Sequence, residues 1–247
     1  MSDLSSVIKS FHLQDKLEPR VWSDDKLNPK VRQILLRVAD HFVKSWKLNR
    51  DIEIKDIRFT GSLAAFNWSR FSDIDLHIIV DFGDVNEDEE LVERFFTLMK
   101  SQWNDEHNVK IGPYEIEVYV ENDGDKHMAT GLYSVKDDKW IKEPSKEDAT
   151  FDEDDIASKS KYFFNIFPIL TSMFKKGEHE KVIANISRLK NKIKKMRSSG
   201  LEKSGQFSTE NLVFKVLRRT NFLEKINKLL RKATDQQLQE KKKTHGG

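Results

Sequence analysis

Two aspartates one residue apart, Asp73 and Asp75, stand at the start of a stretch that otherwise has the composition of a buried strand, IDLHIIVDF. Alternate side chains of a strand point to the same face, so both carboxylates are expected on one face. Their mutual repulsion is costly unless a cation lies between them. Hard divalent ions such as Mg²⁺ bind carboxylate oxygens, and sites for phosphoryl or nucleotidyl transfer use such ions in pairs. The pattern therefore predicts a metal site on a strand over residues 74–82.

The dipeptide Gly61-Ser62 follows a second predicted strand, over residues 54–59, and precedes the two aspartates. A glycine directly after a strand lets the backbone approach a phosphate closely. The Ser62 hydroxyl and neighbouring amides can then donate hydrogen bonds to phosphate oxygens. We therefore expect this turn to hold a triphosphate while the aspartates hold the metal ions.

These motifs together resemble the signature of the DNA polymerase beta-like nucleotidyltransferase superfamily. Ten residues separate Ser62 from Asp73, and the second motif reads Ser72-Asp73-Ile74-Asp75-Leu76, a spacing similar to that of the small bacterial members. The superfamily includes antibiotic nucleotidyltransferases, poly(A) and CCA-adding enzymes and cyclic-oligonucleotide synthases. Three longer segments, NWSRFSDIDLHIIVDF, GLYSVKDDKWIKEP and ENLVFKVLRR, resemble nucleotidyltransferase-domain proteins of tailed-phage genomes.

The resemblance implies a fold and an activity. The fold is an α/β (α+β) nucleotidyltransferase fold with a mixed sheet, followed by an all-helical C-terminal domain. The activity is transfer of a nucleoside monophosphate from an NTP to an acceptor hydroxyl, with release of pyrophosphate. Two Mg²⁺ or Mn²⁺ ions would serve as cofactors.

The resemblance also implies a third acid on a later strand, which the segment YEIEVYV supplies. Glu115 and Glu117 share a face of this strand, so both are candidates. We favour Glu117, because the apolar run that follows it is more similar to the family pattern. By resemblance, Asp73 and Asp75 would bind both metal ions, and Glu117 would bind the catalytic ion and help to deprotonate the attacking hydroxyl. Glutamate stands here where many relatives have aspartate, so the strand is expected slightly further back.

The nucleotide-binding residues implied by the resemblance are Gly61, Ser62, Ser72 and Lys161, the last from the helical domain. Lys159 and Lys161 are equally consistent with a solvated helix face. His77 either contacts a nucleotide or is a hydrogen-bonded structural residue, and we favour the second interpretation. Trp68 and Phe71 either stack on a base or pack within their loop, and packing is again the favoured interpretation.

Hydrophobic periodicity predicts the remaining elements. Asn28-Pro29 is expected to open the first long helix, Asn86 the second and Ser208 the last. Helices are predicted over residues 29–46, 86–99, 154–174, 178–197 and 208–230. A third strand is predicted over 109–120, where Gly112-Pro113 indicates a bulge or a later start, and a hairpin over 132–141. Residues 198–206 are predicted as a linker. The domains expected are a nucleotidyltransferase catalytic domain over 1–150, a basic helical domain over 151–236 and a flexible tail over 237–247.

Charge divides the chain in the same way. Residues 156–247 hold 22 Lys and Arg against 7 Asp and Glu, whereas residues 1–155 hold 21 against 34. This asymmetry suggests two modules with different roles. A dense basic run either faces RNA or DNA or balances the acidic module: Arg188, Lys190, Lys192, Lys194, Lys195 and Arg197.

The basic module favours a nucleic-acid acceptor such as an RNA 3′ end. The alternatives are a cyclic or linear oligonucleotide synthase, an enzyme that modifies a protein or small molecule, and a nucleic-acid-binding regulator on an inactive nucleotidyltransferase scaffold. The chain has no cysteine, which excludes disulfides and thiolate zinc sites. It shows no signal peptide and no run of about 20 apolar residues, so we expect a cytoplasmic protein without a membrane partner.

Overall fold

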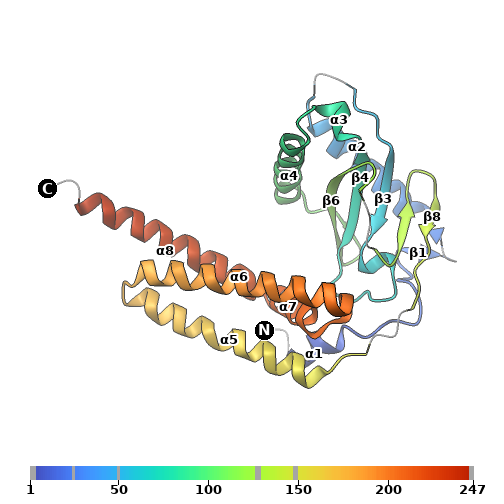
Figure 1. Ribbon diagram of the computed structural model, residues 1–247. Helices are drawn as coiled ribbons and strands as arrows, with labels where there is room; N and C mark the ends of the chain where they lie inside the picture. The colour runs from blue at the N-terminus through green and yellow to red at the C-terminus, as the bar shows by residue number, and fades with distance from the viewer. Residues whose placement is uncertain (1–3, 24–25, 49–50, 126–128, 147–149, 245–247) are drawn as a thin grey trace. The chain divides into compact units, whose positions relative to one another are not determined.

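The computed structural model divides the chain into two compact units, which are described separately (Figure 1). The sheet unit is His12–Glu147, and the helical unit combines Met1–Phe11 with Asp148–Gly247. The structure describes residues 4–23, 26–48, 51–125, 129–146 and 150–244, with side chains up to residue 239. The division lies close to the boundary predicted at residue 150, but the segment up to Phe11 belongs to the helical unit and not to the predicted catalytic domain.

The sheet unit is built on a six-stranded mixed sheet with the strand order β5-β6-β4-β3-β7-β8. The strands are β3 (Asp56–Thr60), β4 (Ile74–Val80), β5 (Lys110–Ile111), β6 (Tyr114–Asn122), β7 (Leu132–Ser134) and β8 (Lys139–Lys142). β4 and β6 pair in parallel, and the other neighbouring strands pair antiparallel. A separate ribbon pairs β1 (Trp22–Ser23) with β2 (Lys26–Leu27). The parallel pair brings the two strands that carry the predicted acids side by side.

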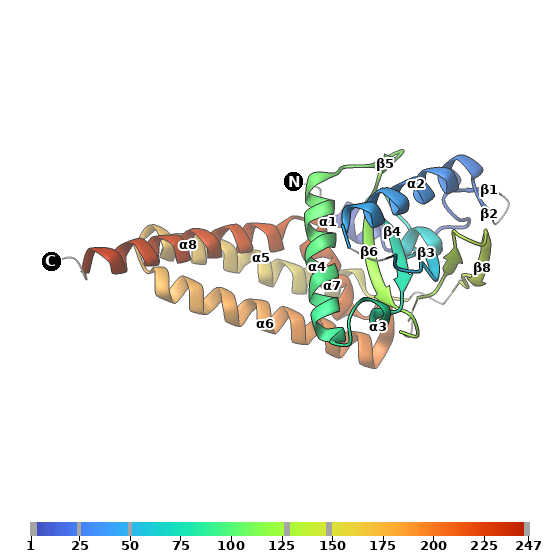
Figure 2. The same cartoon turned by 90° about the horizontal axis from the view of Figure 1, so that it is seen from above.

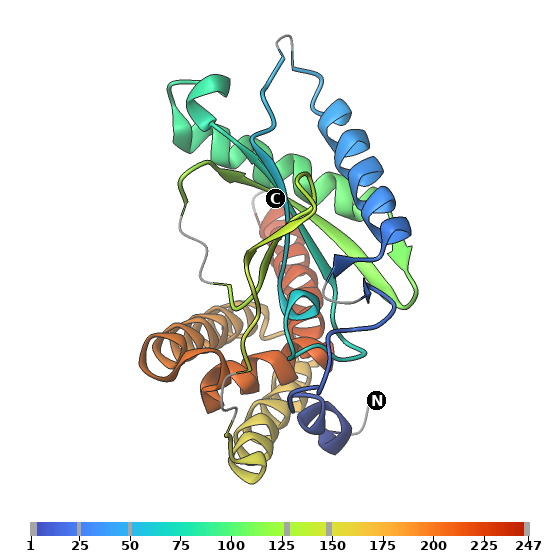
Figure 3. The same ribbon diagram turned by 90° about the vertical axis from the view of Figure 1, so that its right-hand side faces the viewer.

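One face of this sheet forms a core with α2 (Pro29–Ser45) and α4 (Glu89–Glu106). α2, drawn in blue in Figure 3, begins as predicted, because the Asn28 side chain accepts a hydrogen bond from the Lys30 amide and proline fits the first helical position. The two helices meet through the rings of Phe42 and Trp103, whose centroids are 5.8 Å apart. The alternate β4 residues beneath them are fully buried: Ile74, Leu76, Ile78 and Val80. The intervening residues of β4 therefore point to the opposite face.

Two boundaries in the sheet unit differ from the prediction. Asn86 does not open the second long helix; it ends the short helix α3 (Phe82–Val85), and the Asp88 side chain caps α4 by accepting from the Leu91 amide. Several residues around this turn are good caps, so the sequence does not single one out. The strand predicted over 109–120 is two strands, because Gly112-Pro113 forms a turn that folds β5 back on β6.

Over its described residues, the helical unit consists of four long helices, one short helical turn and the first helix of the chain. They are α1 (Leu4–Lys9), α5 (Glu153–Lys175), α6 (His179–Ser204), η2 (Gly205–Phe207), α7 (Thr209–Arg219) and α8 (Phe222–Thr244); the sheet unit holds the other 3-10 turn, η1 (Ser62–Ala64). Figure 2 shows α5, α6 and α8 as long neighbouring helices. The Asp152 carboxylate caps α5 by accepting from two backbone amides, as an acidic helix start should. Over the described residues, no helix has a stretch long and apolar enough to cross a membrane.

Three predictions for this unit are wrong. The segment 198–206 is not a linker, since α6 continues to Ser204. Gly200, which suggested a linker, lies inside that helix. A side-chain carbon at this position would come within 2.7 Å of the Glu210 Cβ, so the glycine lets α6 and α7 pack closely. The last predicted helix is two helices, divided at Asn221, which adopts a φ of +58°. Residues 237–244 are helical rather than a tail, because Gln, Leu, Glu and Lys are strong helix formers; residues 245–247 lie outside the described residues.

Candidate metal centre

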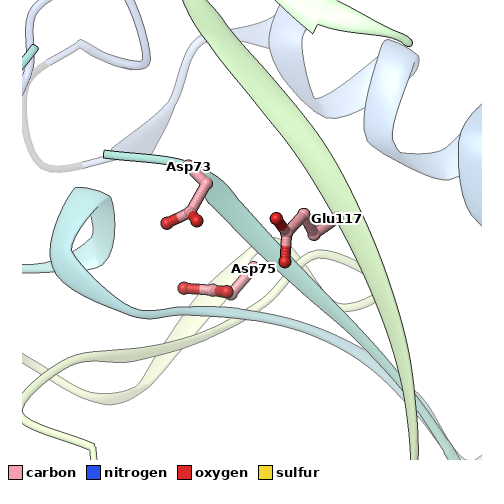
Figure 4. A group of neighbouring side chains, drawn as sticks. All are labelled: Asp73, Asp75 and Glu117. Carbon is pink, nitrogen blue, oxygen red and sulfur yellow. The ribbon is translucent and has the colours of Figure 1, made fainter. Parts of the chain in front are cut away.

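Three carboxylates meet on the face of the sheet opposite the core. Asp73 lies immediately before β4, Asp75 on β4 and Glu117 on β6. One oxygen atom from each lies within 4.8 Å of the others, and all three residues are half-buried (Figure 4). The parallel pairing of β4 with β6 places Asp75 directly beside Glu117. This arrangement concentrates negative charge in a partly desolvated place, which suits a divalent cation.

The structure separates the two candidates for the third acid. Glu115 pairs with Lys110 of β5, and its carboxylate lies 2.8 Å from the Lys110 ammonium at an exposed edge. Glu117, two residues further, lies beyond the reach of the short strand β5 and faces the aspartates. Strand alternation alone does not distinguish Glu115 from Glu117, because it puts both on the same face. The structure distinguishes them, since Glu115 pairs with β5 and Glu117 lies beside Asp75.

Gly61 lies against the Asp75 carboxylate. It follows β3, whose last residue, Thr60, pairs with Asp75, and it has a φ of +82°. A side-chain carbon at Gly61 would lie 2.0 Å from the Asp75 Oδ2 atom, which is far inside contact distance. The positive φ favours glycine at this position, and a side chain here would displace the Asp75 carboxylate from its place in the cluster.

The Ser62 and Ser72 hydroxyls close the loop that carries Asp73. Their oxygen atoms are 2.7 Å apart, and the Ser69 amide donates a 3.0 Å hydrogen bond to the Ser72 hydroxyl. The structure thus brings three of the predicted nucleotide-binding residues, Gly61, Ser62 and Ser72, to the carboxylate cluster. Their binding of a phosphate stays a prediction.

Tyr119 is a site residue that the sequence reasoning missed. Its hydroxyl donates a 2.6 Å hydrogen bond to the Glu117 Oε2 atom and so fixes that carboxylate. Burial raises the pKa of Tyr119, and the hydrogen bond to Glu117 and the nearby Asp75 charge raise it further. The phenol therefore remains a donor at all ordinary pH values. Its position two residues after Glu117, on the same face of the strand, was the available signal.

Lys100 is the second missed residue. Its ammonium lies 3.6 Å from the centroid of the Tyr119 ring, in a cation–π contact. Burial lowers the pKa of Lys100, and the Glu117 and Asp75 carboxylates oppose that shift. No local pattern points to this residue, because it lies on α4 and reaches the site only through the packing of that helix against β6.

The favoured interpretations of the neighbouring side chains agree with the structure. His77 stacks on Tyr119, with centroids 4.7 Å apart, and its Nδ1 atom lies 2.6 Å from the Glu121 carboxylate. The indole of Trp68 donates to the Lys16 carbonyl at 2.8 Å, and Phe71 is covered by the Arg70 guanidinium. A contact of any of the three with a nucleotide stays untested.

The two lysines predicted near the triphosphate lie on α5 of the helical unit. The Lys159 ammonium forms ion pairs with the Asp155 carboxylate at 2.9 Å and the Glu210 carboxylate at 3.3 Å. These ion pairs favour a role for Lys159 within the helical unit over a contact with a triphosphate. Lys161 is exposed. The carboxylates all belong to the sheet unit, and a contact between Lys161 and a triphosphate stays a prediction.

Comparison with protein-family models, curated proteins and solved structures finds no match for this chain. A function therefore has to be argued from the geometry of the carboxylates and of the residues around them.

Proposed function

We propose that the protein is a metal-dependent nucleotidyltransferase that moves a nucleoside monophosphate from an NTP to an acceptor hydroxyl. The observation that carries the proposal is the meeting of Asp73, Asp75 and Glu117 within 4.8 Å, with the Gly61 backbone packed against Asp75. This geometry joins the two sequence motifs that resemble the nucleotidyltransferase signature. It supports a site in which phosphate and metal ion arrive at the same place.

The donor set fits Mg²⁺ or Mn²⁺. Carboxylate oxygens are the preferred ligands of such hard ions, and a cluster with three negative charges offers more charge than one ion neutralises. When bound, two such ions supply electrostatic stabilisation to the attacking and leaving oxygens of an in-line displacement. Asp73 and Asp75 would hold both ions, and Glu117 would hold one of them.

The chain's own residues then have distinct tasks. The Tyr119 hydrogen bond occupies one lone pair of Glu117 and orients its carboxylate toward the aspartates. Glu117 accepts the proton of the acceptor hydroxyl, whose oxygen forms a new bond to the α-phosphorus. The bond between that phosphorus and the oxygen bridging to the β-phosphate breaks, and pyrophosphate leaves with the electron pair. Half-burial of the three acids strengthens these electrostatic interactions relative to open water.

The serine pair is suited to hold the phosphates. Because the Ser72 oxygen accepts from the Ser69 amide, its own hydrogen can be directed to the Ser62 oxygen. The Ser62 hydrogen is then available to a phosphate oxygen. The Gly61 backbone, which has no side chain, leaves space for this approach.

A nucleic-acid acceptor is favoured by the basic surface of the helical unit. The basic run on α6 has no aromatic residues in sequence, but the structure supplies them from neighbouring helices. Lys192 donates to the Tyr162 hydroxyl at 3.0 Å, and the Arg197 guanidinium lies 4.3 Å from the centroid of the Phe214 ring. Surfaces that combine cations with aromatic rings bind single-stranded nucleic acid through phosphate contacts and base stacking. We therefore propose a strand end, such as an RNA 3′ end, as the acceptor.

Metal binding is tested with the variant Asp73→Asn/Asp75→Asn. Mn²⁺ is expected to raise the melting temperature of the wild type, since an ion at about a hundred times its Kd stabilises the folded state by about 2.7 kcal/mol. The variant should lose this response and should be at least as stable as the wild type without metal, because the repulsion between the carboxylates is removed. Glu115→Gln is the matched control and should retain the response. An unchanged Mn²⁺ response in the double variant would contradict the metal centre.

Transfer itself is tested by incubating the wild type with each α-labelled NTP, Mn²⁺ and bulk RNA. Label on the RNA, absent with the double variant, is the expected result. Label in a small nucleotide product would instead identify an oligonucleotide synthase, and label on protein would identify a protein-modifying enzyme. Intact metal binding without any incorporation would contradict the enzyme and favour a regulator.

A further inference from the structure

Helix α4 closes the free edge of the sheet next to the metal centre. The strand β5 covers only the first residues of β6, so further along β6 no strand among the described residues pairs with that side. There the Asn104 side chain donates to the Val118 carbonyl at 3.3 Å and accepts from the Val118 amide at 3.1 Å. The Asn104 side chain thus makes the two backbone hydrogen bonds that a neighbouring strand would otherwise make, and these bonds hold α4 against the edge of β6.

Lys100 lies one helical turn before Asn104 and therefore beside the same edge. Its ammonium lies over the Tyr119 ring, 3.6 Å from the centroid, and the hydroxyl of that ring is bonded to Glu117. The Glu117 and Asp75 carboxylates act on the Lys100 ammonium electrostatically, but its close contact is with the Tyr119 ring. A cation–π contact leaves the ammonium hydrogens available, so a half-buried positive charge is held next to the site with its donors uncommitted.

The order of the strands gives the metal centre two distinct sides. β3 and β6 flank β4 on opposite sides, so the Gly61-Ser62 turn that follows β3 and the Lys100–Tyr119 pair beside β6 lie across the aspartates from each other. If the turn holds the triphosphate, the acceptor hydroxyl has to approach on the side of Glu117. Lys100 is then on the acceptor side.

We propose that Lys100 binds a phosphate of the acceptor, so that the acceptor is a nucleotide chain with a phosphate near its reactive hydroxyl. This inference rests on the proposed nucleotidyl transfer and deepens it by naming the residue that contacts the acceptor phosphate. Lysine binds phosphate as a point charge, and partial desolvation strengthens the attraction. An uncharged acceptor, such as an aminoglycoside-like alcohol or a protein hydroxyl, would offer the Lys100 ammonium no negative charge of its own.

The test compares a charged and an uncharged acceptor of the same shape. The probes are the dinucleotide adenylyl-adenosine and its methylphosphonate analogue, which lacks the phosphate charge. Both are too short to depend on the basic helices. Their affinities are measured by NMR titration of the full-length protein holding Mg²⁺ and a non-hydrolysable ATP analogue, for the wild type, Lys100→Gln and Lys110→Gln. Lys110 is an exposed lysine on β5 at the same edge and is the charge-matched control.

The wild type and Lys110→Gln are expected to bind the charged dinucleotide about tenfold more tightly than the methylphosphonate, as one charge-assisted contact provides. Lys100→Gln should bind the two probes equally while its affinity for the ATP analogue stays unchanged. The same preference in Lys100→Gln as in the wild type, no preference in the wild type, or a loss confined to the ATP analogue would each overturn the inference. A wild type that binds no metal–nucleotide complex at all would overturn the proposed function, and this inference with it.

Discussion

Gly61 shows how one residue can serve the site in a way that its sequence context does not reveal. A glycine between a strand and a serine suggests a phosphate-binding turn, and the structure adds a second requirement. The Asp75 Oδ2 atom occupies the space that any side chain at position 61 would take. The turn and the Asp75 carboxylate are therefore sterically linked, and a change at one is expected to disturb the other.

Gly61→Ala is accordingly expected to weaken metal binding as well as the fold. A side chain at a φ of +82° costs about 1–3 kcal/mol of stability, and the new methyl group has to displace the Asp75 carboxylate. We expect Mn²⁺ affinity, measured by titration calorimetry, to fall by about tenfold or more. Gly124→Ala is the matched control, because Gly124 has a φ of +98° but nothing within 4 Å of the added carbon. It should lose stability alone, and equal Mn²⁺ affinities in the two variants would contradict the steric link.

The residues of the site differ in how well the sequence predicts them, because some of their positions depend on tertiary packing more than others. Asp73, Asp75 and Gly61 lie in one short segment whose strand alternation is readable from sequence. Glu117 was favoured over Glu115 only on its resemblance to the family pattern, since alternation puts both on one face, and the structure places Glu117 beside Asp75. Lys100 was not predictable, because its place above Tyr119 follows from the way α4 packs along β6.

At the scale of elements, the long periodic helices and the central strands were predicted, with the bounds of α2 and α5 correct to within one residue and those of α4, α6 and α8 wrong. α2 and β4 carry strong patterns of period 3.6 and 2, which local propensity and burial both favour. The turn at Gly112-Pro113 folds β5 back on the adjacent strand β6, whereas the continuation of α6 through Gly200 depends on the packing of α6 against α7. Small residues mark turns in one case and close helix packing in the other, and composition alone does not distinguish the two.

The contact between α4 and β6 gives a prediction at this scale. Asn104→Ala removes both hydrogen bonds to Val118 and leaves a backbone amide and carbonyl without their side-chain partner, which we expect to cost about 1–3 kcal/mol. Hydrogen exchange of the Val118 amide should accelerate. Gln102→Ala removes only an exposed hydrogen bond to Glu106 on the same helix and should leave that amide protected. Unchanged exchange at Val118 in Asn104→Ala would show that the edge is held by other contacts.

For the whole molecule, charge and pattern together predicted two units but not the route of the chain between them. The shift from acidic to basic composition near residue 155 matches the start of the helical unit. The N-terminal helix α1 was missed, because six residues give too little periodicity to reveal which core they join. Its buried residues, Val7 and Ile8, belong to the helical unit, so the unit is completed by both ends of the chain.

Phe11 tests this closure of the helical unit by the N-terminal segment. Its side chain is buried, packs edge-on against Phe151 and lies under the Arg219 guanidinium, 4.6 Å from the ring centroid, while Arg219 also donates to the Ser10 hydroxyl at 2.7 Å. Phe11→Ala should lower the free energy of unfolding of the helical unit by about 3–5 kcal/mol. Hydrogen exchange should accelerate in α7, which carries Arg219, and less or not at all in β4.

The matched control is Lys9→Ala, an exposed position on α1 next to the buried pair. It should leave exchange in α7 unchanged, since a surface substitution of this kind changes stability by no more than about 0.5 kcal/mol. If Phe11→Ala leaves exchange in α7 unchanged, as the control is expected to do, the first residues contact the helical unit without stabilising it. If instead exchange rises first in β4, the segment belongs energetically to the sheet unit, and the division of the chain at residue 11 would be wrong. If exchange accelerates in α7 as expected, the segment up to Phe11 is a structural part of the helical unit, because its removal would expose the side of α7 against which it packs.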